Sequence, residues 1–123
     1  MSVPVAIEEL RQQVVACGPD AFLVTVSDTA SPHATSAAVS WDGDELVVGA
    51  GRTTAANAAA SPAVTLLWPA AGRDYSLIVD GSAVVDGDVV RITPTHAILH
   101  RSVLAAAPDG HRAGDAPRCI TVL

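Results

Sequence analysis

The sequence contains no lysine, only two cysteines and only four aromatic residues among its 123 positions. All seven basic residues are arginines, and the 13 acidic residues leave a formal net charge of −6 at pH 7. Nucleic-acid binding requires clustered positive charge that neutralises phosphates. The acidic balance, the scattered arginines and the few aromatic side chains therefore argue against a nucleic-acid partner.

Long apolar runs are also missing, although half of the residues are hydrophobic. No uninterrupted apolar stretch reaches the length that spans a bilayer. The first 13 residues carry acidic side chains where a secretory signal would have a basic region and an apolar core. We therefore expect a cytoplasmic protein with no membrane association, in which Cys17 and Cys119 remain free thiols.

The pattern of apolar residues and turns predicts a mainly β protein. An amphipathic helix is expected over residues 4–17, ended by Gly18 and Pro19. Asp-Gly pairs then mark two-residue turns, and strands joined by such turns must be antiparallel. The expected strands are 21–27, 33–41, 45–49, 64–68, 75–86, 89–93 and 118–123, with Gly81 as a candidate bulge or point of close approach.

These elements fit one domain over residues 1–123, large enough for its own core. We predict a small antiparallel β-barrel of six or seven strands with two or three short helices, because closing the sheet removes exposed strand edges. Residues 94–107 could form a helix or continue the preceding strand, since their periodicity fits both. Residues 109–117 are expected to form a loop.

The stretch 46–68 reads as a strand, a glycine-rich turn, a short alanine-rich helix and a second strand. Thr53 or Thr54 could cap this helix, because a hydroxyl oxygen accepts a hydrogen bond from a first-turn N–H group. Arg52 precedes them, and a helix N-terminus beside a cation and hydroxyls suits an anion. The alternative is an ordinary cap with a solvated arginine. Asn57 could bond the same ligand or brace a neighbouring segment.

Gly49 and Gly51 also invite comparison with a dinucleotide-binding fingerprint. Thr54 stands where that motif needs a third small residue, the helix is too short to cross a parallel sheet, and hairpins precede it. A mononucleotide-type anion site therefore fits the stretch better than a Rossmann unit.

Other residue types with catalytic or metal-binding chemistry form no motif. His96 and His100 would align on one face of a helix, but no Cys or carboxylate stands beside them at ligand spacing, so no metal is predicted. No nucleophile motif occurs, and no residue can be assigned as a catalytic acid or base. Trp41 and Trp68 are core or interface residues, or could stack on a planar ring.

The order of these features resembles the pyridoxamine 5′-phosphate oxidase-like, FMN-binding split-barrel superfamily. The resemblance covers roughly residues 5–101. Its most specific part is an N-x-x-x-[NS]-P-x-V pattern from Asn57 to Val64. The other matching segments are Pro32–Ser36, Trp41-Asp42-Gly43, 46–51, Arg52-Thr53-Thr54 and Trp68.

The resemblance implies a flavoprotein oxidoreductase that acts on a small-molecule substrate as a homodimer, with two FMN sites at the subunit interface. It places the FMN phosphate at Arg52, Thr53, Thr54 and Asn57. It places the flavin ring against the strand over 34–38, with the remaining contacts expected from Thr35, Ser36 and Trp68.

This chain departs from the superfamily pattern in its charge. Many members have a basic pair where Arg52-Thr53-Thr54 supplies one cation, and the strand over 34–38 lacks basic residues. The resemblance therefore leaves two alternatives to FMN open. One is a deazaflavin coenzyme on the same scaffold, and the other is a non-catalytic dimeric binding protein without a tightly held cofactor. Because the sequence ends at Leu123 without the substrate-binding segment of the true vitamin oxidase, we do not expect pyridoxamine phosphate oxidation.

Overall fold

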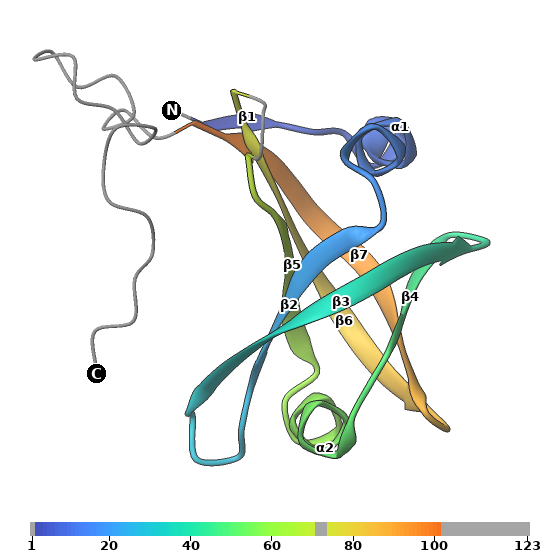
Figure 1. The fold of residues 1–123 in the computed structure, drawn as a ribbon, viewed down its shortest axis with the longest axis vertical. Helices are drawn as coiled ribbons and strands as arrows, with labels where there is room; N and C mark the ends of the chain where they lie inside the picture. The colour runs from blue at the N-terminus through green and yellow to red at the C-terminus, as the bar shows by residue number, and fades with distance from the viewer. Residues whose placement is uncertain (1, 71–73, 102–123) are drawn as a thin grey trace, which may run out of the picture.

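The computed structural model describes residues 2–70 and 74–101 (Figure 1). Two helices and seven strands account for most of them, which confirms the predicted mainly β architecture. In chain order the elements are β1 (Ser2–Pro4), α1 (Ile7–Cys17), β2 (Asp20–Val26), β3 (Pro32–Asp42), β4 (Glu45–Gly49), α2 (Arg52–Ala60), β5 (Ala63–Trp68), β6 (Ser76–Asp86) and β7 (Val89–His100).

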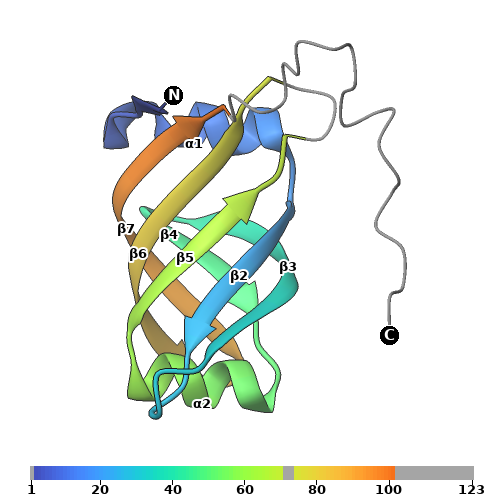
Figure 2. The same cartoon turned by 90° about the vertical axis from the view of Figure 1, so that its left-hand side faces the viewer.

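Six of the strands form a closed antiparallel barrel. The sheet runs in the order β1-β7-β4-β3-β2-β5-β6, and an additional pairing between β6 and β7 closes the ring. β7 is long enough to pair with β4 over Val89–Ile92 and with the extra strand β1 over Ile98–His100. The two helices lie at opposite ends of the barrel, α1 beside the N-terminal strand and α2 across the other end (Figures 1 and 2).

The two tightest hairpins form where the Asp-Gly pairs predicted them. Asp42 pairs with Glu45 and Asp86 with Val89, so each loop contains two residues. Each loop begins with a glycine at positive φ, 62° at Gly43 and 65° at Gly87. Glycine adopts this conformation without the steric penalty that other residues meet, and the turn therefore matches the twist of its strands.

Alternation along the strands fills the barrel. Leu46 and Val48 on β4, and Leu66 and Trp68 on β5, are at most 1% exposed, whereas their neighbours in sequence face outward or are half-buried. The Trp68 Nε1–H donates to the Gly18 carbonyl at 2.8 Å, which ties the end of β5 to the turn between α1 and β2. Burial of these side chains supplies the main driving force for closure.

Gly81 lies at the irregularity in the β6–β7 ladder that the sequence predicted. The register shifts between Asp80 and Gly81, and Thr95 on β7 is left out of the pairing. A Cβ atom on Gly81 would lie 2.5 Å from Ile92 Cγ2 and 2.8 Å from the Thr93 carbonyl oxygen. Only glycine allows the two strands to approach this closely.

Arg91 joins the tips of the two hairpins. Its Nη1 lies 2.9 Å from Asp42 Oδ2 and 3.2 Å from Glu45 Oε1, and its Nε lies 3.0 Å from Asp86 Oδ2. Hydrogen bonds to Asp42, Asp86 and Glu45, in that order of importance, raise the pKa of Arg91 above its ordinary value. The guanidinium therefore stays charged and engaged with these carboxylates.

Several boundaries differ from the sequence-based expectations. The predicted helix over 4–17 begins at Ile7, because Ser2–Pro4 pairs with β7 as a strand that the sequence did not predict. Of the two alternatives for residues 94–107, helix or continued strand, the structure shows the strand as far as His100, where β7 ends. His96 and His100 therefore lie on a strand. The loop at 109–117 and the strand at 118–123 lie outside the described residues.

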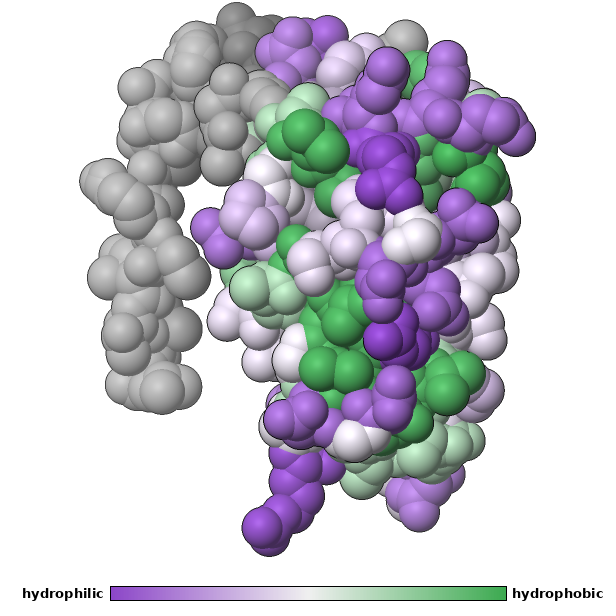
Figure 3. Space-filling model, turned by 90° about the vertical axis from the view of Figure 1, so that its right-hand side faces the viewer, coloured by the Kyte–Doolittle hydropathy of each residue, from purple (hydrophilic) through white to green (hydrophobic). Residues whose placement is uncertain are grey.

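The surface carries few large apolar side chains. On the face of the molecule opposite to that of Figure 2, apolar patches are interrupted by hydrophilic side chains (Figure 3). Neither helix in the described part of the chain has the length and apolar character needed to cross a membrane. Among residues 2–70 and 74–101, the exposed large hydrophobic residues are Val3, Ile7, Val15, Phe22 and Val84.

Candidate functional site

The start of α2 is the strongest candidate for an anion site. The helix begins at Arg52, with Gly51 as an N-cap in extended conformation whose carbonyl accepts the Ala55 N–H at 2.9 Å. The prediction that Thr53 or Thr54 caps the helix is therefore wrong, because the turn after β4 brings the chain into helical conformation at Arg52, two residues earlier than a cap at Thr53 would allow. Among the described residues, no side chain caps this end. Its first-turn N–H groups are thus oriented for an external acceptor.

Arg52 provides the positive charge at this helix start. Its side chain is exposed, and among the described residues it forms no ion pair. Arg91 is held by three carboxylates, and the Arg11 guanidinium lies over the Trp41 ring. Arg52 is therefore a cation that no described carboxylate neutralises, placed where the helix dipole also favours an anion.

The predicted phosphate-binding residues divide into an exposed pair and a buried pair. Arg52 and Thr53 are exposed, whereas Thr54 and Asn57 are only 5% and 7% exposed. The Asn57 Nδ2 donates to Thr25 Oγ1 on β2 at 3.1 Å. Asn57 thus anchors α2 to the barrel, which is the bracing role that the sequence left open beside ligand binding.

β3 presents an open edge. Within the described part of the chain, residues 32–38 pair with β2 on one side only, because the pairing with β4 begins at Val39. This half of β3 runs toward the end of the barrel that α2 covers (Figures 1 and 2). Unpaired backbone N–H and C=O groups on such an edge can bond a planar heterocycle.

Thr35 and Ser36 lie on opposite faces of β3, as successive residues of a strand must. Ser36 is exposed and Thr35 is half-buried on the barrel side. Ser36 borders a hollow of about 340 Å³ on the outer surface, formed with Asp20, Ala21, Phe22, Ala37 and Ala38. The structure therefore does not place the side chains of Thr35 and Ser36 in the same site.

Trp68 occupies the core. It is 1% exposed, and its N–H group is already bonded to Gly18. Of the two roles that the sequence left open, core packing is the one observed, and the indole does not reach the candidate site.

Phe22 is a surface residue that the sequence reasoning did not select. It pairs with Ser36 across the β2–β3 ladder and is 42% exposed. The alternation in β2, with Ala21, Leu23 and Thr25 inside, is the signal that could have placed Phe22 outside.

Among the described residues, no group of three or more His, Cys, Asp or Glu side chains is arranged to bind a metal ion.

Comparisons with known proteins agree with this architecture. No protein-family model matches the sequence. The uncharacterised protein Mb0449c of Mycobacterium bovis is 38% identical over an alignment of 109 residues. The match covers 74% of this chain and 75% of that protein. A pyridoxamine 5′-phosphate oxidase-like protein from Listeria innocua superposes with a TM-score of 0.63 at 18% identity, over 76% of this chain and 100% of the other. An F420 reductase superposes with a TM-score of 0.56 at 18% identity, over 65% of this chain and 90% of the other.

The barrel therefore has the fold of the pyridoxamine 5′-phosphate oxidase-like split barrels, as the order of motifs predicted. The chain belongs to the family that contains the mycobacterial protein Mb0449c.

Proposed function

We propose that this protein binds FMN and acts as an oxidoreductase on a small-molecule substrate. The observation that carries the proposal is the start of α2, where an uncapped helix end and an arginine without an ion pair among the described residues meet. A flavin phosphate is an anion of the size that such a helix end binds, and the guanidinium of Arg52 adds a charge-assisted hydrogen bond.

The flavin ring would lie along the open edge of β3. The backbone groups of residues 34–38 would orient it, and the Ser36 hydroxyl offers a further hydrogen bond on the outer face. The bound flavin supplies hydride chemistry, while the protein supplies binding and orientation. No described side chain is assigned as a catalytic acid or base.

A homodimer would complete this site. Phe22 is exposed beside the hollow that Ser36 borders, and small residues there leave the sheet surface accessible to a second copy. We expect Phe22→Asp to weaken self-association about tenfold or more, since a charge replaces an apolar contact. Val84→Asp is the matched control, because Val84 is 62% exposed on β6 away from this hollow. Sedimentation equilibrium measures both, and an unchanged dimer in Phe22→Asp would contradict the assignment of this face.

Absorbance of the purified protein provides the first test of the cofactor. A flavin spectrum that dithionite bleaches would support the proposal. In FMN titrations, Arg52→Ala should then weaken binding by about 1.5–3 kcal/mol, because a charge-assisted bond to the phosphate is lost. Arg101→Ala removes the same charge after β7, at the opposite end of the barrel from α2 (Figure 1), and should leave the FMN dissociation constant unchanged. Equal constants for Arg52→Ala and the unmodified protein would refute the phosphate assignment.

A deazaflavin coenzyme is the second candidate, favoured by the structural likeness to an F420 reductase. Parallel titrations with FMN and with the deazaflavin coenzyme separate the two, since the tighter ligand identifies the cofactor. If neither binds, the protein is a non-catalytic dimeric binding protein and the oxidoreductase proposal fails.

A further inference from the structure

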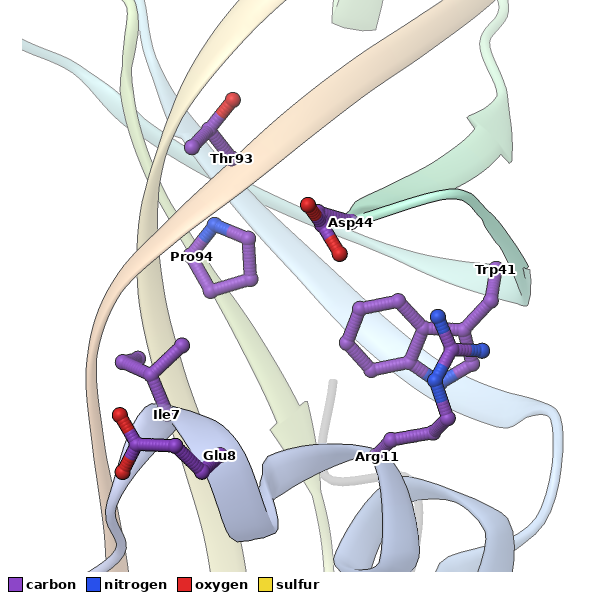
Figure 4. A pocket seen from close by; sticks show the side chains of 7 residues that line it. All are labelled: Ile7, Glu8, Arg11, Trp41, Asp44, Thr93 and Pro94. Atoms are coloured by element: carbon purple, nitrogen blue, oxygen red, sulfur yellow. The ribbon is translucent and has the colours of Figure 1, made fainter.

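A cleft of about 400 Å³ opens at the end of the barrel opposite to α2. It lies beside the stretch of β7 between the residues that pair with β4 and those that pair with β1, and α1 lies across this stretch. Figure 4 shows the residues that line the cleft. They come from α1, from the β3–β4 hairpin and from β7, and they are Ile7, Glu8, Arg11, Trp41, Asp44, Thr93 and Pro94.

One wall of the cleft already holds a cation on an aromatic face. The Arg11 guanidinium lies over the Trp41 ring, with its central carbon 4.5 Å from the ring centroid (Figure 4). Arg11 Nη2 also donates to the Gly43 carbonyl. The Trp41 Nε1–H is buried and has no hydrogen-bond partner within the described part of the chain. Arg11 therefore already occupies one electron-rich face of this indole, and the indole N–H is a donor that no described acceptor uses.

The other walls combine apolar surface with carboxylates that have no described partner. Ile7 and Pro94 lie on the side away from Trp41, and the Asp44 carboxylate points into the space between them and the ring (Figure 4). Among the described residues, neither Asp44 nor Glu8 forms an ion pair or a hydrogen bond through its side chain. The guanidinium of Arg11 bonds to Gly43 rather than to either of them.

We propose that this cleft is a second ligand site, which binds a small organic cation with a flat apolar body. The cationic group would pair with Asp44, the flat body would pack against Ile7 and Pro94, and Glu8 adds a second negative charge at the edge of the cleft. A volume of 400 Å³ is within the range of small-molecule sites. The site is independent of the proposed FMN site, because α1 and α2 lie at opposite ends of the barrel.

The charges of the residues that line the cleft favour a cation over an anion. The cleft contains two carboxylates against one guanidinium, and that guanidinium is already engaged by the Trp41 ring and Gly43. An anion would therefore meet net repulsion, whereas an amidinium or amine would neutralise the two carboxylates.

Three probes of the same ring size test the proposal: benzamidine as the cation, benzamide as the neutral analogue and benzoate as the anion. NMR of the ¹⁵N-labelled protein follows the two indole N–H signals, and Trp41→Phe identifies which signal belongs to Trp41. We expect benzamidine to shift the Trp41 signal to saturation and to leave the Trp68 signal in place, since Trp68 is enclosed by the core. Benzamide and benzoate should bind at least about threefold more weakly.

Variants test the role of the carboxylates. The Glu8→Gln, Asp44→Asn double variant should weaken benzamidine binding about threefold to twentyfold, as expected for the loss of one exposed ion pair and of a second negative charge at the cleft. Glu9→Gln removes a charge from the same turn of α1 without touching the cleft, so it should not change the dissociation constant. The proposal is overturned if benzoate binds as tightly as benzamidine, if no saturable shift of the Trp41 signal occurs, or if the double variant binds benzamidine as well as the unmodified protein does. Each result is read without FMN, so it does not depend on the flavin assignment.

Discussion

The close approach of β6 and β7 at Gly81 predicts a large effect from the smallest possible substitution. In Gly81→Ala the new methyl group would meet Ile92 Cγ2 at 2.5 Å and the Thr93 carbonyl oxygen at 2.8 Å, both far inside van der Waals contact. The Ile92 side chain can rotate, but the Thr93 oxygen belongs to the backbone of β7 and moves only if the ladder moves.

The cost of this overlap follows from the packing. Overpacking a well-filled core destabilises a protein by about 1–3 kcal/mol. Alanine also restricts the unfolded chain more than glycine does, which offsets about 0.4–1 kcal/mol of this destabilisation. The φ of Gly81 is not in the positive range, so no strain term adds to these two. We therefore expect Gly81→Ala to lower the free energy of unfolding by about 1–2 kcal/mol.

Urea unfolding followed by circular dichroism measures this change as a lower midpoint at constant slope. Gly49→Ala is the matched control, because a Cβ at Gly49 would have no atom within 4 Å. That control should be neutral or slightly stabilising. If Gly81→Ala unfolds at the same urea concentration as Gly49→Ala, the close approach of β6 and β7 is not the reason for glycine at this position.

Two further predictions concern stability. Asn57→Ala should lower the free energy of unfolding by about 1–3 kcal/mol, because it leaves the buried Thr25 hydroxyl without its donor. The same substitution should destabilise the protein less in a Thr25→Val background. Equal losses of stability in both backgrounds would show that the Asn57–Thr25 hydrogen bond is not the cause. Ala30→Gly should stabilise the protein by about 0.5–1 kcal/mol, because Ala30 has a φ of 65° in the β2–β3 turn; a lower melting temperature would contradict this strain.

Strand positions and hairpins could be predicted because they depend on local chemistry. Alternating apolar residues and Asp-Gly turns are visible in the sequence, and β2 to β6 formed close to the expected boundaries, whereas β7 continues beyond the expected end to His100. β1 could not be found in this way. Its three residues carry no pattern of their own, and they become a strand only because β7 continues to His100 and offers them an edge.

The burial and orientation of the candidate site residues could be predicted only in part. Arg52 and Thr53 are exposed at the helix start, as a ligand contact requires. Trp68 shares the phase of Val64 and Leu66, so its position in the core could have been read from β5 alone. The open edge of β3 has no such signal, because it depends on where β4 begins to pair.

The short strand β4 has a consequence for how the protein opens. Its five residues connect β3 to β7 and complete the ring, whereas the other barrel strands would remain one continuous sheet without it. β4 leads directly into the turn that begins α2 and carries Arg52. Detachment of β4 and α2 would therefore be a local unfolding event that separates the proposed anion site from β3 without dismantling the remaining sheet. A ligand that bridges α2 and β3 would bind only the closed ring, so it would shift the equilibrium against this opening in proportion to its saturation.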